Sequence, residues 1–162
     1  MNQLANAFGK DFVKNKEAVR TRTFTLGGHT FKVKVPLTSE FEAMQERIKV
    51  IDEAKVEQYY KEMTAGFEQF KGQDTGAVKC EWLENDLLID GRSMRDTAKN
   101  KALMQNRITE MFKLLVPEEK GFDMGTITYD MIEELFPFPI QMQLLDELSN
   151  TISPAYEAQR GK

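Results

Sequence analysis

The stretch TRTFTLGGHTFKVKVPLTSEFEAMQERIKVI, residues 21–51, decides the predicted fold. It predicts two antiparallel strands that turn at Gly27-Gly28 and stop at Pro36, followed by an amphipathic helix from Ser39. A two-residue turn fixes the strand register. The expected pairs are Phe24 with Phe31, Leu26 with His29, and Arg22 with Val33. The opposite face is expected to be solvated and carries Thr21, Thr23, Thr25, Thr30, Lys32 and Lys34.

The helix after Pro36 is predicted to cover the apolar face of this hairpin, because an isolated hairpin is marginally stable in water. Ser39 and Glu42 have the spacing of a capping box. Four apolar residues then recur at helical spacing and form a predicted core stripe, namely Phe41, Met44, Ile48 and Ile51. The pattern resumes at Val56 after a step of five, so we expect the helix to bend there or to turn a second face outward.

Helices are predicted for most of the remaining chain. One holds Trp82, Leu83, Leu87 and Leu88 and ends at Gly91; the others run from Ser93 to Pro117, from Thr128 to Leu135, and from Pro139 onward. The expected fold class is therefore α+β and mostly α-helical, with an N-terminal antiparallel β-hairpin packed on a long amphipathic helix and a bundle of shorter helices. We expect a loosely ordered arm at 1–18, a single domain at 19–152 with a candidate hinge at 72–76, and a mobile tail at 153–162.

The composition argues against several classes of protein. The 162 residues carry 22 basic and 26 acidic side chains, a balance that does not favour generic binding to nucleic acid or to an anionic membrane. The single cysteine excludes an internal disulfide and a cysteine-based metal site, which fits a reducing cytosol. No apolar run approaches the roughly 18 residues of a membrane span. Basic and acidic blocks alternate along the chain and could pair within the fold or between copies.

No constellation of residues indicates catalysis. Serine or cysteine nucleophiles usually need a histidine base, and the one histidine, His29, is predicted at the hairpin turn. Gly27-Gly28 matches neither phosphate-binding glycine pattern, and no metal-binding spacing is present. The basic segment at 92–113 lacks the interleaved aromatic residues that stack on bases, so a solvated helix face is the favoured interpretation. We therefore predict no enzyme and no catalytic, cofactor-binding or metal-binding residue.

A protein-binding surface is the remaining hypothesis. The chain contains eleven phenylalanines and nine methionines, and such soft apolar side chains can adapt to different partners. The residues expected to stay partly exposed and to bind a partner are Leu4, Phe8, Phe12, Phe136, Phe138 and Met142. The plainer alternatives are that most of these side chains fill the core and that the first three belong to a frayed arm.

The hairpin TFTLGGHTFKVK, followed by LTSEFEAMQERI, resembles the N-terminal part of the tail assembly chaperones of long-tailed, siphovirus-like bacteriophages. The resemblance covers about residues 21–51. It implies a non-structural protein of the host cytoplasm that binds the tape-measure protein and keeps it soluble until tail-tube subunits polymerise around it. The implied partners are the tape-measure protein, the major tail tube protein and further copies of the chain, with no cofactor, no nucleic acid and no membrane.

Two alternatives to this hypothesis remain open. One is a structural tail or head-tail completion protein that stays in the virion, and the other is an unrelated cytosolic adaptor. For the chaperone, we expect Phe41→Asp to abolish client binding by unfolding the core. We expect Phe138→Asp to abolish it while leaving the fold intact.

Overall fold

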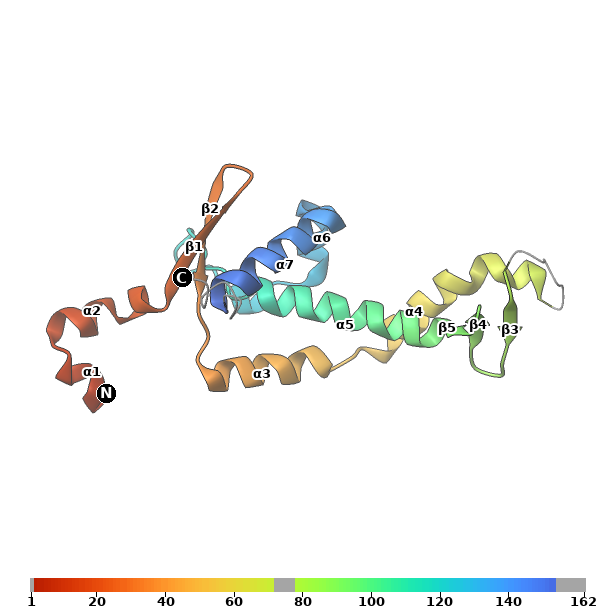
Figure 1. Ribbon diagram of the computed structural model, residues 1–162, viewed down its shortest axis with the longest axis horizontal. Coiled ribbons are helices and arrows are strands. Elements are labelled where there is room, and N and C mark those ends of the chain that lie inside the picture. The colour runs from red at the N-terminus through yellow and green to blue at the C-terminus, as the bar shows by residue number, and fades with distance from the viewer. Residues whose placement is uncertain (1, 72–77, 154–162) are drawn as a thin grey trace, which may run out of the picture. The chain divides into compact units, whose positions relative to one another are not determined.

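The computed structural model describes residues 2–71 and 78–153, which form two compact units (Figure 1). The first unit comprises residues 1–44 and 108–162, and the second comprises residues 45–107. The fold is α+β and mostly helical, as the sequence predicts. The unit boundaries fall within helices α3 (Thr38–Lys49) and α5 (Met94–Phe112). The predicted hinge at 72–76 and, apart from Ser153, the predicted tail lie outside the described residues.

The first unit contains the predicted β-hairpin. Strands β1 (Thr21–Leu26) and β2 (His29–Lys34) pair in the expected register, with Phe24 opposite Phe31 and Arg22 opposite Val33. Both turn glycines have positive φ, as a two-residue turn of this kind requires. The rings of the Phe24 and Phe31 pair stack at 5.2 Å. The register prediction is therefore confirmed.

The helix that packs most extensively on this hairpin is α7 (Phe138–Ile152), which follows it by about a hundred residues. The prediction named the helix after Pro36 as the main partner of the hairpin, and this was wrong because α7 contacts both strands more extensively. Leu144 and Leu148 of α7 are completely buried, and Arg22 on β1 donates a hydrogen bond to the Thr151 carbonyl at 2.8 Å. Sequence proximity favoured α3, but α7 is the more apolar helix.

The outer edge of β2 is also partly covered. The Lys34 amide donates to the Leu114 carbonyl at 2.9 Å, and the Val116 amide donates to the Lys32 carbonyl at 2.8 Å. Val33, which is fully buried, forms an isolated bridge with Leu115. The residues after α5 therefore satisfy strand-edge groups that would otherwise be open to pairing with another chain. Leu115, predicted in the helix, belongs to this bridge instead.

Two short helical elements lie between Val116 and α7. They are the 3-10 turn η2 (Met124–Thr126) and α6 (Tyr129–Leu135), in which the Thr128 hydroxyl accepts the Met131 amide as the predicted N-cap. The buried amide of Gln141 on α7 donates to Glu133 Oε2 at 2.7 Å and to the Phe136 carbonyl at 2.8 Å. This network fixes the turn between α6 and α7.

The predicted long helix from Ser39 is two helices. The first, α3, begins at Thr38, where the Glu40 carboxylate accepts the Leu37 amide at 2.9 Å in place of the expected Ser39 and Glu42 cap. It ends at Lys49, and α4 (Glu53–Thr64) starts after Asp52, whose side chain accepts the Ala54 amide at 3.0 Å.

The apolar step of five after Ile51 marks the break between these helices. In the second unit the Asn106 side-chain amide donates to the carbonyls of Ile48 at 3.0 Å and Val50 at 2.8 Å. These bonds satisfy the carbonyls at the end of α3, which a continuous helix would have used itself. Phe41 is 40% exposed, so it is not the core residue that the stripe predicted.

The second unit contains a three-stranded antiparallel sheet where the sequence predicted a helix. Its strands are β3 (Cys80–Trp82), β4 (Leu87–Ile89) and β5 (Arg92–Ser93), in the order β3-β4-β5. Asp90 and Gly91, both with positive φ, form the two-residue turn between β4 and β5. An Asp-Gly pair is a strong hairpin signal, whereas a short apolar run is ambiguous between strand and helix.

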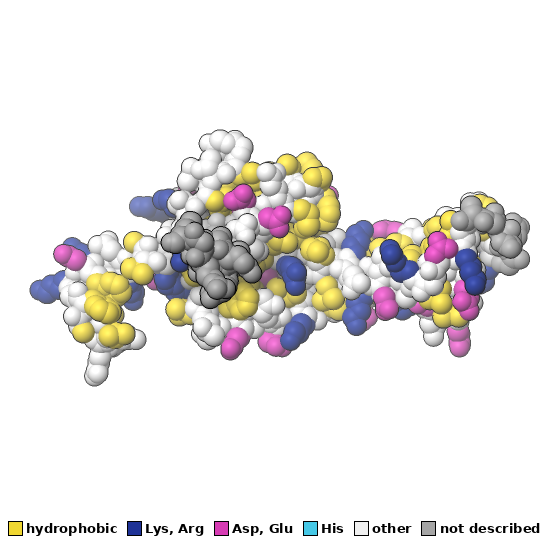
Figure 2. Space-filling view, in the orientation of Figure 1, with side chains coloured by type: hydrophobic (Ala, Val, Ile, Leu, Met, Phe, Trp, Pro, Cys, Tyr) yellow, Lys and Arg dark blue, Asp and Glu magenta, His cyan; other side chains and the backbone are white. Residues whose placement is uncertain are grey.

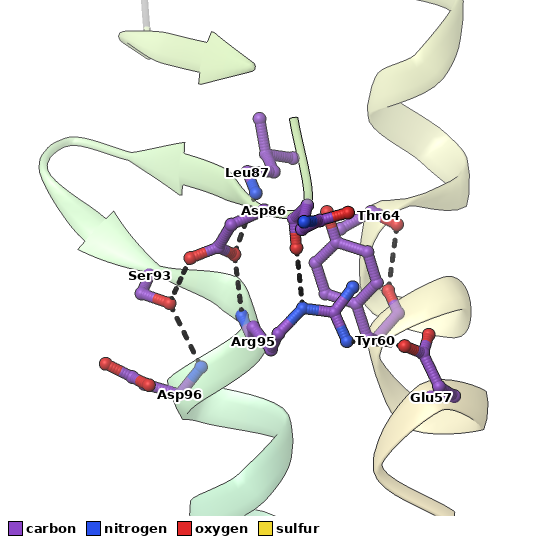
Figure 3. Close-up of polar contacts among 9 residues, drawn as sticks. Glu57, Tyr60, Thr64, Asp86, Leu87, Ser93, Arg95 and Asp96 are labelled. Carbon is purple, nitrogen blue, oxygen red and sulfur yellow. Dashed lines mark hydrogen bonds and ion pairs between the residues drawn. The ribbon is translucent and has the colours of Figure 1, made fainter. Parts of the chain in front are cut away.

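A polar network joins this sheet to two helices of the second unit (Figure 3). Asp86 accepts the amides of Leu87 at 2.8 Å and Arg95 at 3.0 Å, and also the Ser93 hydroxyl. Arg95 pairs with Glu57 of α4 at 2.7 Å, and its guanidinium lies 4.1 Å from the centre of the Tyr60 ring. Ser93 also caps α5 by accepting the Asp96 amide at 3.0 Å, as predicted.

The remaining core of the second unit lies between α4 and α5. Val56, Ala98 and Ala102 are buried together, with Tyr59, Tyr60 and Met63 packed against them. The small alanines allow close approach of the two helices. The chain after α4 continues in a 3-10 turn, η1 (Ala65–Phe70).

We expect Asp86→Ala to destabilise the second unit by about 1–3 kcal/mol, because three buried or half-buried donors lose their acceptor. Burial raises the pKa of the Asp86 carboxyl, but the bonds from Ser93, Arg95 and Leu87 outweigh it and lower the pKa. Hydrogen exchange of the β4 and β5 amides would measure the loss. Glu84→Ala is the control, because Glu84 is an exposed acidic residue two positions before Asp86. Asp90→Ala is unsuitable, because Asp90 has a positive φ that alanine adopts poorly.

Candidate functional site

The N-terminal residues form two helices, α1 (Gln3–Ala7) and α2 (Lys10–Val19), which lie against each other. Neither helix contains a buried residue. Gly9 separates them with φ 98° and ψ 170°, a backbone conformation that is essentially restricted to glycine. Gly9 is therefore the residue that folds α1 back on α2.

A groove of about 380 Å³ opens on this helical pair. We call it the arm groove and define it by its apolar lining residues Leu4, Phe8, Phe12, Val13, Val19 and Leu37. Leu4 and Phe8 are 64% and 62% exposed, and the rings of Phe8 and Phe12 meet edge-on at 5.1 Å. Figure 2 shows hydrophobic side chains gathered on the arm. Three of the predicted partner-binding residues are thus brought together in one concave surface.

Contacts at the end of α2 attach the arm to the hairpin. The Val35 amide donates to the Arg20 carbonyl at 2.7 Å, and Arg20 Nε donates to the Val35 carbonyl at 3.0 Å. Arg20 also forms an ion pair with Glu40, and Glu17 pairs with Lys34 at 2.9 Å. Because Leu37 lies between these contacts and α3, they hold one wall of the groove in place.

We expect the attachment of α2 to weaken in acid. The Lys34 ammonium lowers the pKa of Glu17, and the Leu37 amide, with Arg20, lowers the pKa of Glu40 below its ordinary value of 4.5. Because these carboxyl pKa values are lower in the folded chain, the unfolded chain binds protons more readily than the folded one. The two carboxylates therefore stabilise the attachment of α2 above pH 4.5, and this stabilisation is lost as the pH falls below 4.5. Hydrogen exchange of α2 amides between pH 3 and pH 6 would follow the change.

The matched control for this pH experiment is the double variant Glu17→Gln and Glu40→Gln. It removes both titrating groups, so its α2 protection should depend less on pH across the same range. Both carboxyls are exposed, so salt should reduce the effect in the unmodified protein. Unchanged acid dependence in the double variant would contradict the assignment.

Gly9→Ala is expected to separate α1 from α2. An alanine at this φ and ψ costs on the order of 1–3 kcal/mol, and no neighbouring atom lies within 4 Å of the added methyl group, so the cost is one of backbone conformation. Limited proteolysis of residues 2–10 should become faster. Gly66→Ala is the control, because Gly66 has no positive φ and equally open surroundings. Equal proteolysis of both variants would show that Gly9 does not shape the arm.

The other predicted partner-binding residues lie near the turn between α6 and α7. Phe138, at the start of α7, is 50% exposed, and Met131 and Leu135 lie one turn apart on α6 with Leu135 74% exposed. We call Met131, Leu135 and Phe138 the α6–α7 patch. Phe136 is half-buried against Phe112, with ring centres 5.9 Å apart, and Met142 is also half-buried. Leu135 and Met131 are exposed apolar residues that the sequence prediction did not single out.

The described residues contain no group of histidine, cysteine and carboxylate side chains that could hold a metal ion. His29 is exposed at the hairpin turn, where its ring lies edge-on to Phe31 at 4.6 Å. Among the same residues, no helix combines the length and apolarity needed to cross a membrane. The candidate binding features are the two apolar surfaces, the arm groove and the α6–α7 patch.

The arm groove is the better built of these two surfaces. Its residues come from α1, α2 and Leu37, which precedes α3; it is concave, and ion pairs fix one of its walls. Exposed apolar surface of this kind is typical of a site for another protein. Comparisons of the chain with protein-family models, with curated proteins and with solved structures found no match.

Proposed function

We propose that the protein is a tail assembly chaperone of a long-tailed bacteriophage, which binds the tape-measure protein and keeps it soluble during tail-tube assembly. The observation that carries the proposal is the arm groove, where Leu4 and Phe8 are more than half exposed. The resemblance of residues 21–51 to that family supplies the identity of the client. A shielding protein needs an accessible apolar surface, and the arm groove supplies one.

The physical basis of the proposed activity is burial of apolar surface. A large apolar side chain that leaves water on binding contributes about 1.5–3 kcal/mol. A long helical client exposes many apolar stripes, so several chaperone copies bound along it act together even when each contact is modest. No covalent step is needed, and the proposed cycle ends when tail-tube subunits displace the chaperone.

Co-expression with a tape-measure protein tests the proposal. We expect the tape measure to remain in the soluble fraction when this protein is present and to aggregate when it is absent. A tape measure that is equally soluble without it, or insoluble with it, would overturn the proposal. Mass spectrometry of purified virions tests the structural alternative, because a chaperone should be missing from the particle and a completion protein should be present.

A further inference from the structure

We infer that the arm groove takes the apolar stripe of an amphipathic helix whose flanking residues are acidic. The inference rests on the proposed function and specifies which part of a client the arm would bind. It depends on two properties of the groove, which are the secondary structure of its lining residues and the net charge around them.

The backbone around the groove favours a helix over an extended peptide. Its lining residues lie in or beside α1 and α2, with Leu37 just before α3, and none of them belongs to a strand. An extended peptide gains affinity by pairing with a free strand edge, which these helices do not offer. A helix satisfies its own backbone groups, and it can insert apolar residues spaced at i, i+3 and i+4 between Leu4, Phe8 and Leu37.

The charge near the groove selects the flanking residues. Four basic and two acidic side chains lie between residues 2 and 20. Arg20 and Glu17 are engaged in ion pairs with Glu40 and Lys34. Lys16 is exposed and lines the groove itself, whereas Lys10, Lys14 and Asp11 line a separate hollow on another side of α2 and add one net positive charge to the same helix. The unbalanced charge is positive and complements acidic residues on a partner.

An anionic membrane has the same chemistry, but the shape of the arm disfavours it. Helices that lie on membranes present one continuous apolar face, which is usually convex and carried by a single long helix. Here Gly9 divides the segment into helices of 5 and 10 residues, and the apolar side chains line a concave surface. A helix fits into such a hollow, whereas a flat bilayer surface does not.

Two synthetic amphipathic helices test the inference. They share one apolar stripe and differ only in carrying glutamate or lysine beside it, and their dissociation constants for the full-length protein are measured by fluorescence anisotropy. We expect the acidic peptide to bind about threefold more tightly at low salt, because Lys16 attracts its glutamates and repels the lysines of the other peptide. The preference should shrink as the salt concentration rises.

The variant that tests the charge replaces Lys10, Lys14 and Lys16 with glutamate. It should lose the preference for the acidic peptide, while the matched control with glutamate at Lys55, Lys61 and Lys99 should keep it. The control changes the net charge equally at exposed positions of the second unit. Circular dichroism should show both variants to be as helical as the unmodified protein.

Several results would overturn the inference. One is equal affinity for the two peptides, and another is an equal effect of the two triple variants. A third is binding to phosphatidylserine vesicles in preference to the acidic peptide. A fourth is a dimer in analytical ultracentrifugation in which the second copy fills the groove. If the tape measure stays soluble on co-expression but the peptides bind equally, the inference fails and the proposed function stands. If the acidic peptide is preferred but the tape measure aggregates, the proposed function fails instead.

Discussion

Replacing Phe8 with aspartate is expected to abolish protection of the client while leaving the protein folded. Phe8 is 62% exposed and lines the arm groove, so the fold gains little from its ring. Binding a client would bury that ring, and an aspartate would bring an unpaired charge into an apolar contact. We expect affinity for a tape-measure fragment to fall at least tenfold, which a pull-down with a soluble fragment would measure.

The control for this experiment is Leu83→Asp, because Leu83 is also exposed but lies in the second unit. It should bind the fragment as the unmodified protein does. Phe138→Asp, in the same assay, tests whether the α6–α7 patch contributes as the sequence predicted. Normal binding by a folded Phe8→Asp protein would remove the arm groove from the proposed function.

Leu144→Ala is expected to have the largest effect on stability. Leu144 is completely buried on α7, the helix that covers both strands of the hairpin. Truncating a buried leucine to alanine costs about 2–5 kcal/mol, which is a large share of the 5–15 kcal/mol typical of a whole domain. Urea unfolding, monitored by the near-ultraviolet circular dichroism of the aromatic residues in the first unit, would show the loss as a lower midpoint concentration.

Leu135→Ala is the matched control for that substitution, because Leu135 lies on α6 and is 74% exposed. Its effect should stay within about 0.5 kcal/mol, the usual range for surface substitutions. A similar loss of stability in both variants would mean that α7 does not form the core of the first unit.

The hairpin could be predicted closely because its determinants are local. Gly27-Gly28 and the strand alternation on either side fix the pairing without reference to the rest of the chain. The same holds for the start of α6 at Thr128 and the start of α7 beside Pro139, where a capping hydroxyl and a proline act within one turn. Each of these predictions was confirmed.

The packing partner of the hairpin could not be predicted in the same way. The choice between α3 and α7 depends on contacts between segments separated by about a hundred residues, and periodicity gives each helix an apolar face without saying what it meets. The sheet at β3 to β5 was missed for a different reason. Its strands are only two or three residues long, so they show no alternation, and the Asp90-Gly91 turn was the usable signal.

The candidate site was predicted in part. Leu4, Phe8 and Phe12 were correctly named together, but the sequence could not indicate that Gly9 divides the segment into two helices or that Leu37 completes the groove. Phe136 and Phe138 were both expected to stay partly exposed, yet only Phe138 is strongly exposed. Whether such a ring packs inward depends on the tertiary fold, here on the position of Phe112.

Site-specific photo-crosslinking tests the central claim most directly. A photoreactive phenylalanine analogue is placed at position 8, or at position 83 as the control, and each protein is irradiated during co-expression with the tape-measure protein. If the arm groove holds the client, position 8 forms a covalent adduct with the tape measure and position 83 does not. Equal adducts at both positions, or none at position 8 while the tape measure remains soluble, would contradict it.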